Sequence, residues 1–285
     1  MSLNLRRIAI KSKQIAGIAY SQPDYDHIYV SDLMRSQRFT DVRLVNSEIE
    51  VVLLDGTSLR ARRYPHSDCG TLRQVFVDGE YDPVVSIFVS NGLPGKGLKV
   101  IDAGANVGYT SAFLFANFPD SEIVCVEPDS ANSRLLRANL KTYVENGRLT
   151  VLEMGLMNED DMNLSVNRDF RDGKDHAIAV EASDSETGLK SISIQRIMQD
   201  RSWDRLDILK MDIEGAERFV FGKDADVSFL ENAVVVAIEI HDEFNIRGQI
   251  HSVLHEYGFV LFESRETTFG VNQRFLGPSL KRSAN

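Results

Sequence analysis

The segment that decides the fold is Val100-Ile101-Asp102-Ala103-Gly104-Ala105-Asn106-Val107-Gly108-Tyr109-Thr110. It starts in a short apolar run, residues 98–102, that predicts a strand, and it leads into residues 109–117, which predict a helix. Gly104 and Gly108 remove Cβ atoms where the chain turns sharply and where a ligand must approach the backbone. Asn106 is one of the few non-glycine residues that tolerate a positive φ. A glycine loop between a strand and a helix is the setting that a nucleotide-like ligand requires.

Short apolar strands alternate with helices on the C-terminal side of this segment. Further strands are expected at residues 122–126, 149–152, 206–211, 234–240 and 259–263, and further helices at 130–143, 217–221 and 246–257. Strands without polar alternation, separated by helices, indicate a parallel sheet that is covered on both faces. The predicted fold class is therefore α/β, a doubly wound, mostly parallel, Rossmann-like sheet.

A Gly/Pro-rich turn cluster at residues 91–97 divides the chain. Before it we expect an N-terminal α+β extension, residues 1–90, and after it the main domain, residues 91–285. The extension contains a basic N-terminal segment that predicts a helix, a β-hairpin formed by residues 49–54 and 58–62, and a short helix at 84–89. Within the main domain, the polar residues 158–190 predict an inserted hairpin or a lid over the substrate.

The composition limits the classes of partner. Hydrophobic residues make up 43% and charged residues 26% of the 285 residues, as in ordinary globular proteins. No apolar run approaches the roughly 18 residues of a membrane span, so no membrane contact is expected. The net charge of −10 opposes binding to nucleic acid. Only two cysteines occur, and Cys125 lies in an apolar run, which favours a reducing, cytoplasmic location.

An acidic residue ends the second strand of the main domain. Glu127 lies where a carboxylate accepts hydrogen bonds from both hydroxyls of a ribose. A nicotinamide dinucleotide site would need glycines where Asn106 and Tyr109 stand, so that a pyrophosphate can approach the backbone. S-adenosylmethionine has no phosphate and does not need them. The loop therefore favours a methyltransferase over a dehydrogenase.

The predicted contacts with S-adenosylmethionine lie mainly after the first three strands of the main domain, with Tyr81 placed to reach the methionine part. They are Asp102, Gly104, Asn106, Gly108, Tyr109, Thr110, Glu127, Pro128, Gly155, Leu156, Asp212 and Tyr81.

A second group of charged residues follows the strand at 206–211. Lys210, Asp212 and Glu214 come where this strand gives way to a helix, and Glu239 and His241 end the next strand. Since the carboxyl ends of parallel strands meet at one edge of a sheet, we expect these side chains near Asp102 and Glu127. Helix capping by Asp212 and compensation of the helix dipole by Glu214 and Glu217 are the structural alternative.

These motifs resemble those of the FkbM-type methyltransferases. The resemblance rests on residues 101–108, on Glu127-Pro128, on Leu209-Lys210-Met211-Asp212-Ile213-Glu214-Gly215-Ala216-Glu217 and on residues 238–241, and it extends from Gly79 to Phe262. It implies the class I methyltransferase fold and O-methylation of hydroxyls on sugars, macrolides and related metabolites. The polar insertion after Asn158 departs from the shorter forms of the family, so the resemblance does not identify the substrate.

Methyl transfer to a hydroxyl requires alignment of the two reactants and removal of a proton. We predict Asp212 and His241 as candidate bases, with Glu239 orienting the histidine and Lys210 as a further catalytic residue. A competing arrangement uses Asp212 and Glu239 as ligands of a divalent metal that binds the hydroxyl. The version without a metal is preferred.

Three alternatives remain at this stage. One is a non-catalytic adenosyl-binding or scaffold protein. Four polar groups at one edge of the sheet argue against it, namely Asp212, Glu214, Glu239 and His241. Another is methylation of the RNA ribose hydroxyl, which salt-sensitive RNA binding would reveal. A metal gripped by His251 and His255, at helical i, i+4 spacing, is disfavoured in comparison with ordinary core or surface histidines. The expected partner is a small hydroxylated molecule, and the sequence leaves the oligomeric state open.

Overall fold

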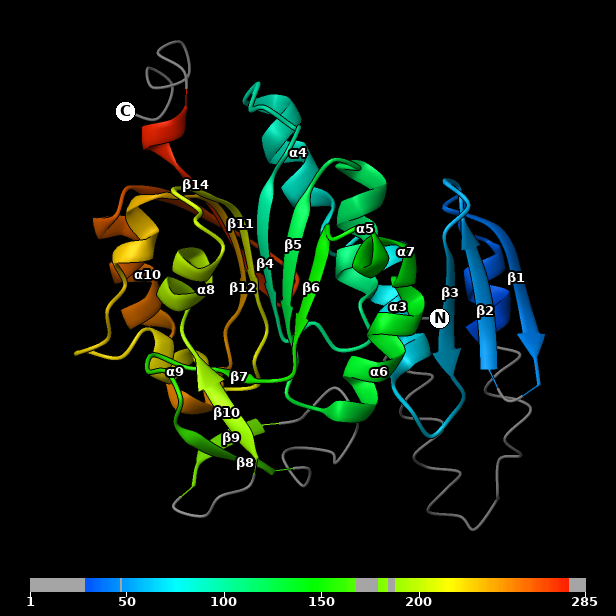
Figure 1. Ribbon diagram of the computed structural model, residues 1–285. Coiled ribbons are helices and arrows are strands. Elements are labelled where there is room, and N and C mark those ends of the chain that lie inside the picture. Colours follow the sequence, from blue (N-terminus) through cyan, green and yellow to red (C-terminus); the bar gives the residue numbers. More distant parts are fainter. Residues whose placement is uncertain (1–28, 47, 168–178, 184–187, 277–285) are drawn as a thin grey trace, which may run out of the picture.

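A seven-stranded sheet forms the centre of the protein (Figure 1). The computed structural model describes residues 29–46, 48–167, 179–183 and 188–276. The strand order is β13-β14-β12-β11-β4-β5-β6. The strands are β4 (Lys99–Ala103), β5 (Glu122–Val126), β6 (Leu149–Leu152), β11 (Leu206–Met211), β12 (Ala233–Glu239), β13 (Phe259–Ser264) and β14 (Thr267–Asn272). Neighbouring strands from β6 to β12 pair in parallel, whereas β14 pairs antiparallel with both β12 and β13.

The sheet is buried on both faces because successive apolar residues of its strands enter different cores. Val100 and Ile208 belong to one hydrophobic cluster, while Ile101 and Leu209 belong to the other. Side chains alternate between the two faces of a strand, so a wholly apolar strand contributes to both clusters. This pattern confirms the predicted doubly wound, mostly parallel α/β fold.

The helices divide between the two faces. Residues of α3 (Asp68–Phe76), α4 (Asp82–Ser90), α5 (Tyr109–Asn117) and α6 (Ser130–Asn139) enter the first cluster. Residues of α8 (Ile194–Asp200), α9 (Glu217–Val220) and α10 (Arg247–Glu256) enter the second. Further helical elements are α7 (Lys141–Glu145) and three 3-10 turns, η1 (Ser228–Glu231), η2 (Asp242–Phe244) and η3 (Gln273–Phe275). Residues 29–34 are also helical.

A separate three-stranded antiparallel sheet lies outside α6, at the N-terminal side of the molecule (Figure 1). It consists of β1 (Phe39–Val45), β2 (Glu48–Leu53) and β3 (Ser58–Arg62), and the pairing of β2 with β3 confirms the predicted hairpin. The buried side of this sheet belongs to the same cluster as α3 and α5. The segment before residue 91 is thus packed onto the main sheet.

The polar insertion contributes strands to a small four-stranded sheet. Its order is β7-β10-β8-β9, formed by β7 (Gly155–Leu156), β8 (Asn163–Asn167), β9 (Ala179–Ala182) and β10 (Leu189–Ile192). Strands β8 and β9 pair antiparallel, as in the predicted hairpin. Figure 1 shows this sheet beyond the edge where β4, β5 and β6 end. A role as a lid remains a prediction.

The sequence prediction missed several elements, namely β1, α3, β10, α8 and β14. Strand β14 is fully buried although it contains Thr267, Thr268 and Asn272. Its polar residues and its glycine hid it from a search for apolar runs. The predicted N-terminal helix lies outside the described residues. Among the helices in the described part of the chain, none has the length and hydrophobicity needed to cross a bilayer.

A buried ion pair fastens the N-terminal sheet to the main domain. The carboxylate of Asp68, which is inaccessible to solvent, accepts hydrogen bonds from the backbone amide, Nε and Nη2 of Arg62 at 2.7–2.9 Å. The same Nη2 also donates to Asn132 of α6 at 2.8 Å. One guanidinium therefore connects β3, α3 and α6.

We expect Asp68→Ala to lower the free energy of unfolding by about 3 kcal/mol, because it leaves a largely buried guanidinium without its carboxylate. Asp41→Ala is the matched control. Its partner Arg43 lies 3.5 Å away and both side chains are about half exposed, so a loss below about 0.5 kcal/mol is expected. Urea unfolding measures both free energies. Equal losses would show that the buried ion pair contributes no more to stability than the exposed one.

Candidate functional site

The loop between β4 and α5 lies against the end of β5. The amides of Gly104 and Ala105 donate hydrogen bonds to the carbonyl oxygen of Val126, at 2.9 and 3.1 Å. Gly104, Asn106 and Gly108 have φ angles of 72°, 48° and 89°. The positive φ predicted at Asn106 is confirmed, and three left-handed residues in five turn the chain from the strand into the helix.

Packing between chain segments explains the two glycines of the loop. A Cβ on Gly104 would lie 1.7 Å from the backbone oxygen of Asp212, which no adjustment of a side chain can relieve. A Cβ on Gly108 would lie 3.0 Å from Leu136 and 3.1 Å from Leu140 of α6. The sequence prediction assigned the missing Cβ atoms to a sharp turn and to the approach of a ligand. The positive φ angles confirm the turn, and close protein neighbours are a further reason for both glycines.

Lys210 joins the loop to β11. Its Nζ donates hydrogen bonds to the carbonyl oxygens of Ala103 and Gly104 at 3.2 and 2.8 Å and lies 3.4 Å from Oδ1 of Asp102. Burial alone would lower the pKa of this amine, but the charges of Asp102, Asp212 and Glu80 outweigh burial and raise it. A buried, charged and fully engaged ammonium is suited to positioning the loop. It is not suited to the catalytic role that the sequence suggested.

Asp102 is buried beneath the loop. Its Oδ2 accepts a hydrogen bond from Ser111 at 2.7 Å, and its Oδ1 faces Lys210. The sequence offered two roles for this carboxylate, orientation of loop amides or attraction of the cationic end of a cofactor. Its observed partners are instead a hydroxyl of α5 and an ammonium of β11. Through Lys210, Asp102 stabilises the loop indirectly.

Glu127 lies at the end of β5, directly beside the loop. Its Oε2 accepts a hydrogen bond from the amide of Asn106 at 2.8 Å, and its Oε1 accepts one from the amide of Asp129 at 2.9 Å. Burial raises the pKa of this carboxyl to about 7, against the opposing effect of the two amides. Nδ2 of Asn132 donates a longer hydrogen bond, 3.4 Å, to the same Oε1. Each carboxylate oxygen has two lone pairs, so Oε2 of Glu127 retains acceptor capacity for a hydroxyl group of a ligand.

The other predicted cofactor residues differ in their accessibility. Tyr109 is buried, and its hydroxyl donates to the carbonyl oxygen of Arg60 in β3 at 2.8 Å. Its side chain therefore serves packing, and only its backbone remains for a ligand contact. Thr110 is buried in the first turn of α5, and Pro128 is partly exposed after Glu127.

Tyr81 lies close to the acidic residues of the site. Burial raises the pKa of its phenol, and the charges of Glu80, Asp212 and Asp102 raise it further. Gly155 and Leu156, in contrast, are used in packing: a Cβ on Gly155 would lie 2.4 Å from Leu164, and the side chain of Leu156 is in the core.

Three acidic residues after β11 surround His241, which follows β12. The Nδ1 of His241 lies 3.1 Å from Oε1 of Glu217, while its Nε2 lies 3.2 Å from Oε2 of Glu214 and 4.0 Å from Oδ1 of Asp212. The chain achieves this convergence by a sharp turn in which Glu214 and Gly215 have φ angles of 52° and 92°. A left-handed conformation at a non-glycine residue costs free energy and is concentrated at functional sites.

His241 is unsuited to the role of general base that we predicted. Its burial opposes a positive charge, but the contacts with Glu214 and Glu217 and the charge of Asp212 prevail and raise the pKa to about 11. In the absence of another cation the ring is therefore protonated at neutral pH. Glu214 and Glu217 hold the ring, so the prediction that Glu239 orients it is also corrected.

Glu239 and Glu80 form an acidic patch with Asp212. Burial raises the pKa of both glutamates, and the charge of Asp212 is the next largest cause for each. For Glu80 the pKa reaches about 6, and its Oε1 accepts a hydrogen bond from Thr267 at 3.3 Å. Glu80 was missed because it precedes β4, the first strand of the main sheet, by 19 residues in the sequence and meets the strand ends only in the fold.

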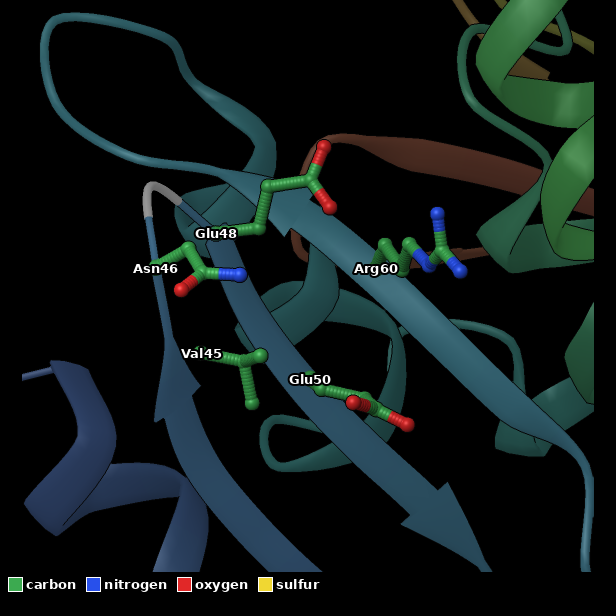
Figure 2. A pocket seen from close by; sticks show the side chains of 5 residues that line it. All are labelled: Val45, Asn46, Glu48, Glu50 and Arg60. Atoms are coloured by element: carbon green, nitrogen blue, oxygen red, sulfur yellow. The ribbon is translucent and has the colours of Figure 1, made fainter.

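The remaining candidates do not converge on a site. His251 contacts Glu263 at 3.3 Å, whereas Nδ1 of His255 faces the carbonyl oxygen of Phe259 at 3.2 Å, as expected for histidines with structural partners. A hollow of about 350 Å³ on the N-terminal sheet is lined by Val45, Asn46, Glu48, Glu50 and Arg60. Figure 2 shows these five side chains. None of the predicted site residues lines this hollow.

Comparison with known proteins identifies the family of this chain. A family model described as the methyltransferase FkbM domain matches residues 102–261, more than half of the 285 residues. Methyltransferase sdnD of Sordaria araneosa is 26% identical over 222 residues, which cover 68% of this chain and 82% of that protein. Methyltransferase 1 of Beauveria bassiana (strain ARSEF 2860) is 23% identical over 217 residues, which cover 68% of this chain and 81% of that protein.

Among solved structures, methyltransferase FkbM from Methylobacillus flagellatus KT is 19% identical to this chain, with a TM-score of 0.37. The similarity covers 61% of this chain and 43% of that one.

The contact between Gly104 and the backbone of Asp212 predicts a specific effect on stability. We expect Gly104→Ala to lower the free energy of unfolding by at least about 2 kcal/mol more than Gly147→Ala does. Both glycines have a similar positive φ, 72° and 76°, but no atom lies within 4 Å of a Cβ on Gly147. Thermal and urea unfolding measure the difference, and equal losses would mean that the loop can move away from Asp212 without cost.

Proposed function

The chain belongs to the FkbM methyltransferase family, and from this premise we propose that it transfers a methyl group from S-adenosylmethionine to a hydroxyl of a sugar or another small metabolite. Its doubly wound sheet has the class I methyltransferase fold. The observation that supports a hydroxyl acceptor is the acidic patch of Asp212, Glu80 and Glu239 at the ends of β11 and β12. The carboxyl groups of Glu80 and Glu239 have raised pKa values, which suits them to exchanging protons near neutral pH.

The residues of the loop fit an adenosyl ligand. Glu127 provides a buried carboxylate next to the loop, and Oδ1 of Asn106 is buried without a hydrogen bond among the described residues. Buried polar atoms are usually satisfied, so this unpaired acceptor supports a ligand with donor groups. In the proposal Oε2 of Glu127 accepts a hydrogen bond from a ribose hydroxyl. S-adenosylmethionine, when bound, supplies a methyl group that is already activated by the sulfonium.

Removal of the acceptor's proton is assigned to Asp212. An alcohol is a poor nucleophile until a base takes its proton. The Asp212 side chain is 30% exposed, compared with 8% for Glu214 and 1% for His241, so it is the member of this group that a substrate can reach. Lys210 and Asp102 maintain the loop beside it. Glu80 and Glu239 offer hydrogen-bonding carboxyl groups to a polyhydroxylated acceptor.

The alternatives receive less support. An acidic patch and a net charge of −10 oppose the phosphates of an RNA substrate. A scaffold without catalysis would have no physical reason to bury Glu214, Glu217 and His241 in contact with one another, since burying charged groups is costly.

A reducing, cytoplasmic location remains part of the proposal. Its support is Cys125, a buried thiol whose pKa is raised by desolvation.

Binding of S-adenosylhomocysteine should depend on the charge of Glu127. In the proposal the carboxylate form accepts a ribose hydroxyl, and the pKa of Glu127 is raised to about 7, so the affinity should fall as the pH is lowered through 7. Glu127→Gln should weaken binding by about 1.5–3 kcal/mol, roughly tenfold to a hundredfold, and abolish this pH dependence. Calorimetry between pH 5.5 and 8.5 measures both effects, with the exposed residue Glu145 changed to Gln as a control. Unchanged affinity of Glu127→Gln would remove the ribose assignment.

Asp212→Asn should lower kcat by roughly 10²–10⁴-fold, the usual contribution of general acid–base catalysis, while the affinity for S-adenosylhomocysteine stays within about threefold of the original. The measurement is transfer of labelled methyl groups into a panel of hydroxylated metabolites. Asp224→Asn is the control, because it removes the same charge from an exposed aspartate. This variant should have normal activity. Normal turnover by Asp212→Asn would contradict the assignment of the chemical step.

A further inference from the structure

We propose that Asp212, Glu214 and His241 bind one divalent transition-metal ion of the Mn²⁺ or Zn²⁺ class at the end of β11. The role of this ion in methyl transfer rests on the proposed function, but its binding does not. The sequence alone paired Asp212 with Glu239 as possible ligands and preferred a site without a metal. The tertiary structure supplies a different set of ligands.

The distances between the three side chains fit a common ion. One potential ligand atom from each residue lies within 4.8 Å of the others. Nε2 of His241 is 3.2 Å from Oε2 of Glu214 and 4.0 Å from Oδ1 of Asp212. Ligand atoms about 2.1 Å from an ion are separated by roughly 3.0 Å in cis and 4.2 Å in trans positions of an octahedron. Small rotations of the side chains are therefore sufficient to close the site.

The histidine provides the independent indication of a ligand. Its side chain is 1% exposed, and within the described part of the chain Nε2 is a buried atom without a hydrogen bond, although it lies 3.2 Å from Oε2 of Glu214. Buried ring nitrogens are normally paired. Nε2 is directed toward the carboxylate oxygens of Glu214 and Asp212 and can offer them a shared cation.

The opposite side of the ring has the partner that metal-binding histidines have. Nδ1 of His241 lies 3.1 Å from Oε1 of Glu217, which is fully buried and also accepts the amide of Ile213 at 3.0 Å. A carboxylate on Nδ1 fixes the tautomer and ring orientation of a metal-binding histidine and increases its basicity. Glu217 is thus a positioning residue. Its carboxylate contacts Nδ1 of His241, and Nε2 on the other side of the same ring would bind the metal.

The charges around the site require a cation. The carboxylates of Asp212, Glu214 and Glu217 all lie within 4.0 Å of one imidazole. The described groups that face this position from other elements include Glu239 of β12, a further acid. The nearby ammonium, that of Lys210, is already engaged by the loop. A divalent ion would compensate more of this negative charge than a single proton does.

The donor set indicates the kind of metal and its effect. One imidazole and two carboxylates suit Mn²⁺ or Zn²⁺, whereas Mg²⁺ and Ca²⁺ prefer oxygen ligands alone. Three protein ligands leave positions for water or for the substrate hydroxyl, whose pKa a bound metal lowers. Coordination through Oδ1 of Asp212 leaves its second oxygen to accept the proton of that hydroxyl. The hydroxyl oxygen of the substrate then forms a bond to the methyl carbon of S-adenosylmethionine. At the same time the bond from that carbon to sulfur breaks, which leaves a neutral thioether.

The test uses the full-length chain without an affinity tag, freed of metals by chelation. Calorimetry with Zn²⁺ and electron paramagnetic resonance with Mn²⁺ should show one bound equivalent, and Mg²⁺ should bind at least about tenfold more weakly. Pulsed resonance of the Mn²⁺ form should show coupling to an imidazole nitrogen. Since this measurement needs no variant, it remains decisive even if changes at the site prevent folding. Binding of much less than one equivalent, or no nitrogen coupling, would overturn the proposal.

Variants then assign the ligands. His241→Gln and Glu217→Gln should each weaken binding by roughly 10–100-fold. His251→Gln is the matched control, because His251 also pairs with a glutamate at 3.3 Å but lies outside the site, and it should bind normally. Equal affinities for His241→Gln and the original protein would refute the assignment. Metal binding without methyl transfer would contradict only the proposed function, and methyl transfer by a chain that binds no metal would contradict only this inference.

Discussion

The site depends on the contact between two backbone segments, the loop after β4 and the chain that leaves β11. Gly104 lies so close to the carbonyl group of Asp212 that no side chain fits between them. The amide of Asp212 also donates to the carbonyl oxygen of Ala103 at 3.1 Å. The residues assigned to the cofactor and those assigned to chemistry are therefore joined by direct backbone contacts. Such contacts matter because methyl transfer depends on alignment, which small displacements disrupt.

Charge balance is the second constraint. Lys210 and His241 are the buried cations among several acids, and each is held by specific partners. Lys210 lies between Asp102 and the loop carbonyls, while His241 lies between Glu214 and Glu217. Burying so many ionisable groups is costly unless they are paired. Their concentration at the carboxyl ends of β11 and β12 is consistent with the proposed active site.

The N-terminal segment contributes to the site as well as to the core. The segment that joins α3 to α4 contains Glu80 and Tyr81. It brings both residues to the acidic patch. Thr267 of β14 holds Glu80, and the guanidinium of Arg265 donates to the backbone oxygen of Asp78 at 2.7 Å. Segments almost 190 residues apart in the sequence therefore meet at this point.

The sequence by itself determined the doubly wound sheet, the glycine loop with its positive φ at Asn106, and the placement of Glu127 at a strand end. These features follow from local periodicity and from the intrinsic preferences of glycine and asparagine, which a short window of sequence contains. Only the tertiary structure decided that Glu214 and Glu217 hold His241, that Lys210 anchors a loop, and that Glu80 joins Asp212. Burial and the charges of neighbours determine the protonation and role of such groups, and these neighbours come from distant parts of the chain.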